Sequence, residues 1–291
     1  MMPRSTQALA FVATASLLGG CDLAAQGGSV YGSFDRTLAV SPHVTLIVEN
    51  GSGDIRVTAG ATGSIHVAGQ IRARDSIFAD LSASQRVARL ESNPPIVQEG
   101  TTVRLGGTGD DALRDVRIDY QITVPPDTAV TTRSGSGDQW IGAVSGRVDI
   151  RAGSGDITVG PVGADVSART GSGDITVSGV SGTVHLTTGS GDVEGRDLRG
   201  GVDIHTASGD INLDGQPAAD WSAAAASGDV IVRFPSNASF TLDASTSSGS
   251  IRTSHAIVAD SDRSRRRLAG PVGGGGPRVR LSTASGSINV E

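Results

Sequence analysis

Hydrophobic and polar residues alternate over most of this chain, in short runs that glycine-rich turns separate. In the unit from Gly171 to Thr188, one residue separates Ile175 from Val177, and after a second turn one residue separates Val184 from Leu186. Alternation with a period of two places apolar side chains on one face of a β-strand. Each unit therefore predicts two short strands and a corner between them.

The turns recur at a nearly constant interval. Six Ser-Gly-Asp turns place their aspartates 18, 18, 18, 18 and 19 residues apart, at Asp138, Asp156, Asp174, Asp192, Asp210 and Asp229. An early copy ends at Asp54, and two later copies carry serine instead, at Ser250 and Ser287. A fixed period of this length is typical of a solenoid. The pattern predicts an all-β fold, a single-chain parallel β-helix with about 18 residues per coil, from about Val44 to Val290.

One such coil would not be stable by itself. About six inward side chains stabilise it by roughly 1.5–3 kcal/mol each when buried, whereas ordering about eighteen residues costs about 1–2 kcal/mol for each. Stacked coils bury each other's faces and satisfy each other's backbone groups, so the array is stable where the unit is not. At the corners, glycine permits a positive φ, and the aspartate carboxylate is expected to accept a backbone N–H two residues further along the same turn.

Changes in composition divide the chain into four regions. We expect a signal peptide that resembles those of lipoproteins (1–20), a tether (21–40), an N-terminal β region with a short helix, continuous with the solenoid (41–130), and the regular β-helix repeats (131–291). Between Ser76 and Glu91, apolar residues at helical spacing predict an amphipathic helix, which two prolines end. This helix would cover an apolar end of the solenoid. Strands are expected around Thr101–Leu105 and over Val116–Val124.

The only cysteine, Cys21, follows a positive start and an apolar run from Ala8 to Leu18 that is too short to span a membrane. With Leu-Gly-Gly before it, Cys21 resembles the lipid-modified residue of a bacterial lipoprotein signal. The resemblance implies a lipid anchor in the cell envelope; an ordinary signal peptide with a chance cysteine is the alternative. Asp22 resembles a signal for retention on the inner membrane, and the choice between inner and outer membrane stays open.

Composition narrows the functional classes. The net charge is −6, which gives no electrostatic reason to expect nucleic acid as a partner. Aromatic residues make up 3% of the chain, which is too few for a conventional globular core but suits thin coils filled with aliphatic side chains. A single cysteine excludes an internal disulfide, and no cofactor is expected.

Three stretches resemble a known family. They are the Gly-Ser-Gly-Asp-Ile series, the strand from Asp119 to Pro125, and the glycine-rich loop that leads into Val279–Ile288. Over about residues 40–291 the chain resembles a bacterial family of putative adhesins, a domain of unknown function with a β-helix fold. The resemblance implies an envelope-exposed, non-catalytic protein and supplies no ligand-binding or active-site residues.

The aspartate series is the strongest candidate site, because coils stacked about 4.8 Å apart would align the carboxylates in a ladder. Calcium-binding β-rolls need an aspartate turn on both sides of each coil. The second turn here, such as Gly160–Gly163, has no carboxylate. We therefore expect the ladder to cap turns and to hold no metal, with a weak cation site as the alternative.

Arg133, Arg151 and Arg169 stand five residues before three of these aspartates and predict an outward column. The column is either a strip for glycans or other anions, or a solvated strand face whose charges discourage sheet aggregation.

His185 and His205 lie on adjacent coils at different offsets, which does not favour a zinc site. Catalysis is not expected, because the chain has no lysine, few aromatic residues and no irregular cluster of aspartates.

We therefore predict a lipid-anchored envelope protein that acts as an adhesin or binding scaffold, as a monomer, with a glycan or an envelope protein as partner. A self-assembling solenoid like the bactofilins is the alternative, and a β-helix enzyme acting on polysaccharides is less favoured.

The two leading hypotheses differ at the C-terminal edge. We expect the arginine-rich loop Ala256–Pro277 to cover that edge; alternatively, the last strand, Ser287–Glu291, turns inward and pairs with an earlier coil.

Overall fold

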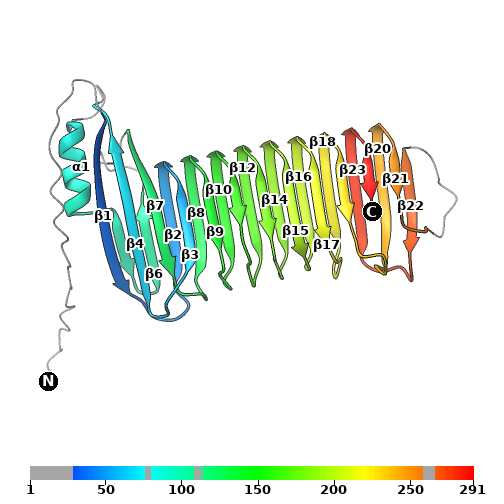
Figure 1. The fold of residues 1–291 in the computed structure, drawn as a ribbon, viewed down its shortest axis with the longest axis horizontal. Helices are drawn as coiled ribbons and strands as arrows, with labels where there is room; N and C mark the ends of the chain where they lie inside the picture. Colours follow the sequence, from blue (N-terminus) through cyan, green and yellow to red (C-terminus); the bar gives the residue numbers. More distant parts are fainter. Residues whose placement is uncertain (1–28, 76–79, 108–112, 114, 258–265) are drawn as a thin grey trace, which may run out of the picture.

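The computed structural model describes residues 29–75, 80–107, 113, 115–257 and 266–291. Their strands form two twelve-stranded sheets along one rod (Figure 1). Sheet A contains, in spatial order, β1 (Val30–Ala39), β4 (Ser64–Ala73), β7 (Val116–Val124), β3 (Ile55–Ala59), β9 (Gln139–Gly142), β11 (Ile157–Val159), β13 (Ile175–Ser178), β15 (Val193–Leu198), β17 (Ile211–Gly215), β19 (Val230–Arg233), β24 (Ile288–Val290) and β21 (Ile251–Thr253). Sheet B contains β22 (Arg267–Val272), β20 (Phe240–Ser248), β23 (Arg278–Ser285), β18 (Trp221–Ser227), β16 (Val202–Ser208), β14 (Val184–Ser190), β12 (Val166–Ser172), β10 (Val148–Ser154), β8 (Ala129–Ser136), β2 (Thr45–Ser52), β6 (Thr102–Gly106) and β5 (Ile96–Glu99).

Parallel pairing between consecutive repeats builds the middle of the rod. In sheet B, Val166 pairs with Val148 on one side and with Val184 on the other. In sheet A, Ile157 pairs with Ile175. Equivalent residues of neighbouring repeats therefore lie side by side. Over the described residues the fold is mostly β with one short helix, as the sequence predicts, and its long, largely parallel sheets are consistent with a β-solenoid.

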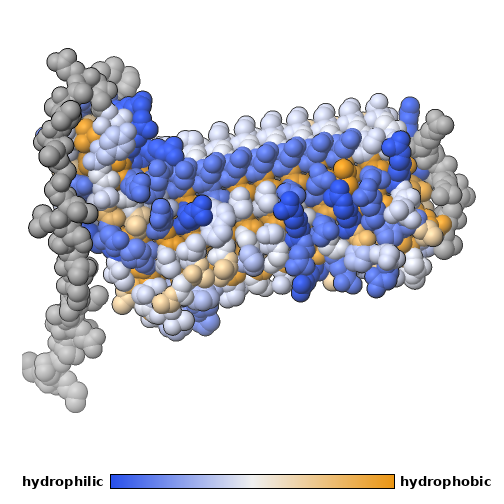
Figure 2. All heavy atoms as spheres, viewed as in Figure 1, coloured by the Kyte–Doolittle hydropathy of each residue, from blue (hydrophilic) through white to orange (hydrophobic). Residues whose placement is uncertain are grey.

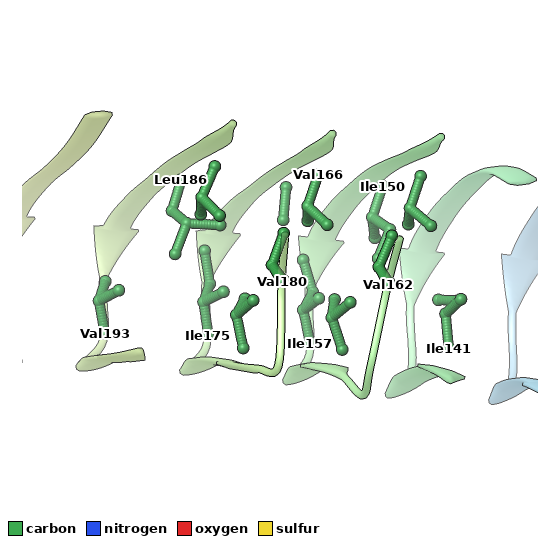
Figure 3. Close-up of a cluster of buried hydrophobic side chains, with 14 of the residues drawn as sticks. Ile141, Ile150, Ile157, Val162, Val166, Ile175, Val180, Leu186 and Val193 are labelled. Atoms are coloured by element: carbon green, nitrogen blue, oxygen red, sulfur yellow. The ribbon is translucent and has the colours of Figure 1, made fainter. Parts of the chain in front are cut away.

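Columns of aliphatic side chains fill the space between the two sheets (Figure 3). Ile157 and Ile175 are fully buried, and Val162 pairs with Val180 through an isolated bridge at a further corner of the coil.

Gln139 occupies the position that Ile157 holds in the next repeat, and it is also buried. Its amide group donates to the Arg151 carbonyl at 3.1 Å and accepts from the Thr132 hydroxyl, which satisfies a polar group in an aliphatic column.

Helix α1 (Ala83–Ser92) starts later than the sequence suggests. The Ser82 side chain accepts the N–H of Gln85, and the Gln85 side chain accepts the N–H of Ser82, which is a capping box. This box fixes the start of the helix at Ala83, whereas the apolar spacing predicted a helix from Ser76. Residues 76–79 lie outside the described part of the chain.

Helix α1 covers the N-terminal end of the rod, as predicted (Figure 1). Its buried residues Val87 and Leu90 face β1 and β4, and Gly32 of β1 leaves the space in which the Val87 side chain packs. The Glu91 carboxylate accepts the N–H of Ser33 at 3.0 Å, so the helix also satisfies a donor of the outermost strand.

Strand β1 corrects the prediction that residues 21–40 form a tether. It pairs antiparallel with β4 and forms the outer edge of sheet A. Phe34 anchors it, because its ring packs over Gly69 and lies edge-on to Tyr120 with the ring centroids 6.2 Å apart. Phe34 is the only fully buried residue of β1, and Gly32 and Arg36 interrupt the inward row that Val30 and Leu38 continue, so its apolar alternation is weak.

The last strands do not follow chain order. β23 lies between β18 and β20, and β24 lies between β19 and β21, so the end of the chain turns inward. β22 lies within Ala256–Pro277, pairs antiparallel with β20 and forms the edge of sheet B. This arrangement corrects the expectation that this segment is a loop over the terminal strand. Arg263 and Arg265 lie outside the described residues.

Substitution of Gly173 tests whether the corner glycines control how closely the coils stack. Its φ is 135°, and a Cβ there would stand 2.2 Å from the carbonyl oxygen of Gly155 in the preceding coil. Gly173→Ala is expected to lower the free energy of unfolding by about 2 kcal/mol or more, because backbone strain and the clash add. Gly51→Ala is the control, since a Cβ at Gly51 meets nothing within 4 Å. Chemical denaturation measures both variants, and equal losses would contradict a special role for the corner glycine.

Candidate functional site

The aspartates form one continuous ladder of hydrogen bonds along the rod. Oδ1 of Asp156 accepts the backbone N–H of Asp174 at 2.9 Å, and Oδ1 of Asp174 accepts that of Asp192 at 2.8 Å. The same bond joins successive members of Asp138, Asp156, Asp174, Asp192, Asp210 and Asp229. Each carboxylate therefore bonds to the next coil, whereas the sequence predicted a bond within its own turn.

The ladder satisfies both backbone groups of each aspartate. The N–H of Asp174 donates to the Asp156 side chain, and its carbonyl accepts the N–H of Ile157 at 2.9 Å. One coil thus supplies both the acceptor for the backbone N–H and the donor for the backbone carbonyl of the aspartate in the next coil. Among the residues that the structure describes, no group of three or more Asp, Glu, His or Cys is arranged to hold a metal ion.

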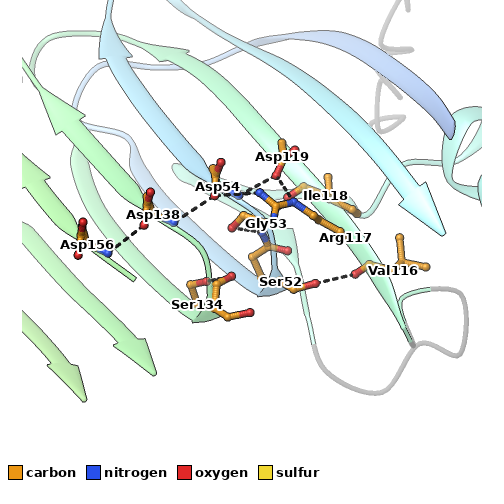
Figure 4. Close-up of polar contacts among 12 residues, drawn as sticks. Ser52, Gly53, Asp54, Val116, Arg117, Ile118, Asp119, Ser134, Asp138 and Asp156 are labelled. Atoms are coloured by element: carbon orange, nitrogen blue, oxygen red, sulfur yellow. Dashed lines mark hydrogen bonds and ion pairs between the residues drawn. The ribbon is translucent and has the colours of Figure 1, made fainter. Parts of the chain in front are cut away.

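Arg117 closes the ladder at its N-terminal end (Figure 4). Its guanidinium lies 3.1 Å from Oδ1 of Asp54 and 3.0 Å from Oδ1 of Asp119. Asp119 accepts the N–H of Asp54, and Asp54 accepts the N–H of Asp138 at 3.1 Å. Asp54 and Asp138 are 84 residues apart in sequence, so the segment between them loops out and builds the end of the rod.

Serine continues the ladder at the other end. The N–H of Ser287 donates to Oδ1 of Asp229 at 2.7 Å, and the N–H of Ser250 donates to Oγ of Ser287 at 3.4 Å. A hydroxyl can accept the same bond as a carboxylate. The Ser-for-Asp change in the last copies therefore keeps the ladder while removing its charge.

A second ladder, inside the corners, was missed. The hydroxyl of Thr188 donates to the carbonyl of Gly173 at 3.1 Å, and that of Thr170 donates to the carbonyl of Gly155 at 3.3 Å. Alternation predicted that these threonines point inward, but not that they serve as donors to the preceding corner. The recurrence of threonine two residues before the corner serine is the signal that identifies them.

The three arginines of the predicted column do lie side by side. Arg151 pairs in register with Arg133 and with Arg169 on the outer face of sheet B, and all three are exposed. Their partners are Glu49 at 2.9 Å for Arg133, Asp149 at 3.4 Å for Arg151 and Ser167 at 3.4 Å for Arg169. Carboxylates neutralise two of the three charges, which weakens the column as an anion-binding strip.

A shallow hollow of about 290 Å³ lies further along the same face, where Gly201 has no side chain. His185, Asp203 and Arg278 are among its lining residues. Nδ1 of His185 lies 3.5 Å from Asp203, and Nε2 of His205 lies 3.2 Å from the same carboxylate. The hollow offers groups of both signs, which suits a small polar ligand.

One sequence prediction falls elsewhere. Cys21 lies outside the described residues, so its lipid modification stays a prediction. Among the described residues, no helix has both the length and the apolar character needed to cross a membrane.

Asp174→Ala tests the ladder. The change removes the acceptor of the Asp192 N–H, so the free energy of unfolding should fall by about 1 kcal/mol, and by less in Asp174→Asn, which keeps an oxygen acceptor. Chemical denaturation measures both. Asp214→Ala, at an exposed aspartate outside the ladder, is the control, and an equal loss there would show that charge alone matters.

Calcium should leave the Tm of the unaltered protein nearly unchanged; a large rise would reveal a cation site.

Three solved structures are similar to the chain over most of its length. One is described as a putative adhesin from Bacteroides fragilis NCTC 9343, with 15% identity, a TM-score of 0.48, and 89% of this chain and 97% of that chain covered. A second is described as a putative lipid binding protein from Parabacteroides distasonis ATCC 8503, with 16% identity, a TM-score of 0.49, and 89% and 96% covered. A third is a putative cell adhesion protein from Clostridium sporogenes ATCC 15579, with 12% identity, a TM-score of 0.29, and 89% and 99% covered.

No curated protein matches the chain. A family model described as Toastrack DUF4097 matches residues 117–291, which is more than half of the sequence and includes the whole regular array. The chain therefore belongs to the Toastrack DUF4097 family.

Proposed function

We propose that this protein is a non-catalytic adhesin or binding scaffold of the bacterial cell envelope, in which each 18-residue repeat forms one coil and lipid on Cys21 provides the anchor. The observation that carries the proposal is a rod that helix α1 covers at one end, that ends in short or proline-containing edge strands at the other, and whose long sides are open. Helix α1 covers one end, and β22 forms the sheet B edge at the other (Figure 1). Such a rod presents its side faces, and these suit an extended partner such as a glycan or an envelope protein.

The surface supports this proposal. Figure 2 shows straight rows of hydrophilic and weakly polar residues along the rod, with hydrophobic residues visible between them. Parallel pairing in register produces such rows, because each repeat adds one side chain to every row. A shallow, open face of this kind suits binding better than catalysis, which needs converging groups in a pocket that excludes water.

The edge strands favour a monomer over a polymer. β21 has three residues and β5 has four, and β22 contains Pro271, which lacks a backbone donor. The fourth edge, β1, has its Ser33 N–H bonded to Glu91 of the helix. Short strands, proline and a covering helix all discourage pairing with another chain.

Size-exclusion chromatography with light scattering tests the alternative of self-assembly, and we expect a monomer. Leu268 and Val272 hold β22 in place with buried side chains, so Leu268→Asp with Val272→Asp should release β22 and promote association through the freed edge of β20. Ala269→Asp, on the other face of β22, is the control. Filaments of the unaltered protein would support the polymer instead.

Cys21→Ser tests the anchor. If Cys21 carries lipid, the variant should leave the membrane fraction or retain its signal peptide, because acylation precedes cleavage in the lipoprotein pathway that the signal resembles. A fatty-acid label should enter the unaltered protein and be absent from the variant. Normal processing and unchanged membrane association of the variant would contradict the lipid anchor.

A further inference from the structure

Two arginines converge on one hydroxyl at the N-terminal end of the rod. Nε of Arg72 lies 3.1 Å from Oγ of Ser29, and Nε of Arg74 lies 3.0 Å from the same atom. Both arginines are exposed, and within the described residues neither forms an ion pair with a carboxylate. Two positive groups that share one neutral acceptor can bind an anion with several oxygens, such as a phosphate.

Exposed apolar side chains lie at the same end. The Tyr31 ring is beside this arginine pair, with its centroid 5.8 Å from Cζ of Arg72, and the residue is 68% exposed. Val97, 51% exposed, lies on β5, the outermost strand of sheet B at that end. These two are the exposed large hydrophobic residues of the described chain. Aromatic rings flanked by arginine are typical of the interface between a membrane and water.

The chain that precedes the described structure enters at this position. Ser29 is only eight positions after Cys21. At no more than about 3.6 Å per step, the Cα atoms of Cys21 and Ser29 are at most about 29 Å apart. If Cys21 carries lipid, as proposed above, Ser29 must stay within that distance of the anchor, and the Arg72 and Arg74 side chains that contact Ser29 stay near the membrane with it. This step rests on the proposed function; the convergence of the arginines does not.

We propose that Tyr31, Arg72 and Arg74 form a phosphate-binding patch that docks the N-terminal end of the rod on an anionic phospholipid membrane. The two guanidinium groups bind headgroup phosphates in place of the Ser29 hydroxyl, and the Tyr31 ring enters the interfacial layer. The patch therefore turns the α1 end of the rod toward the membrane and the β22 end away from it (Figure 1).

Vesicle sedimentation tests the patch with the chain from Asp22 to Glu291, which contains every described helix and strand and no Cys21. It should bind vesicles that contain phosphatidylglycerol more tightly than vesicles of phosphatidylcholine alone. Since an arginine near such a surface contributes roughly fivefold in affinity, Arg72→Gln with Arg74→Gln should weaken binding by about twenty-five-fold. The control is Arg151→Gln with Arg169→Gln, which removes the same charge from sheet B and should have little effect.

Circular dichroism melting confirms that each variant is folded. Equal weakening by both double variants, or no preference for phosphatidylglycerol, would overturn the proposal. Inorganic phosphate that binds the patch without any vesicle binding would overturn it as well and indicate a soluble ligand. Because this assay omits Cys21, its outcome is separate from that of the fatty-acid label, and either can fail without the other.

Discussion

The missing side chain at one glycine of each corner sets how closely the coils stack. A Cβ at Gly155 would stand 2.3 Å from a carbonyl oxygen of the preceding corner, and one at Gly191 would stand 2.1 Å from its counterpart. Any other residue would force the coils apart or twist the turn. At the spacing that glycine allows, the aspartate reaches the next backbone N–H and the threonine reaches the corner carbonyl. Both ladders and the aliphatic columns therefore depend on this contact.

The same spacing explains how the array tolerates interruption. The bond from Asp54 to Asp138 spans 84 residues, yet it has the form of the bond between consecutive repeats such as Asp156 and Asp174. A coil requires only that its neighbour in space presents the right turn, whichever part of the chain supplies that turn. Long segments can therefore leave the stack, build a covered end and return, as the segment with β4, α1 and β7 does.

How much the sequence predicts depends on whether a feature is local. The strand Val116–Val124 was predicted with its observed bounds, because alternation is a local property of a half-buried strand. β1 escaped detection because Phe34 is its only fully buried residue, with Val30 and Leu38 only partly buried on the same face. The inward return of Ser287 was one of two alternatives that the sequence left open, and the structure confirms it. The sequence could not choose between them, since the repeated turns are almost interchangeable and Ser287 would fit beside either Asp229 or the last coil. Sequence shows that a turn belongs to the stack, but its place in the stack depends on long-range contacts.

The outward-facing residues of the candidate site could be predicted only in part, for the same reason. Stacking fixes the inward residues and the corners, so the outward positions are left free to differ between coils. Along one outward row, Arg169 is followed by Thr187 and then by His205. A partner lying along sheet B would thus meet arginine, then hydroxyl, then imidazole groups in a fixed order. If the side faces bind an extended partner, this order favours one register over all shifted ones, so a regular scaffold need not bind its partner uniformly along its length.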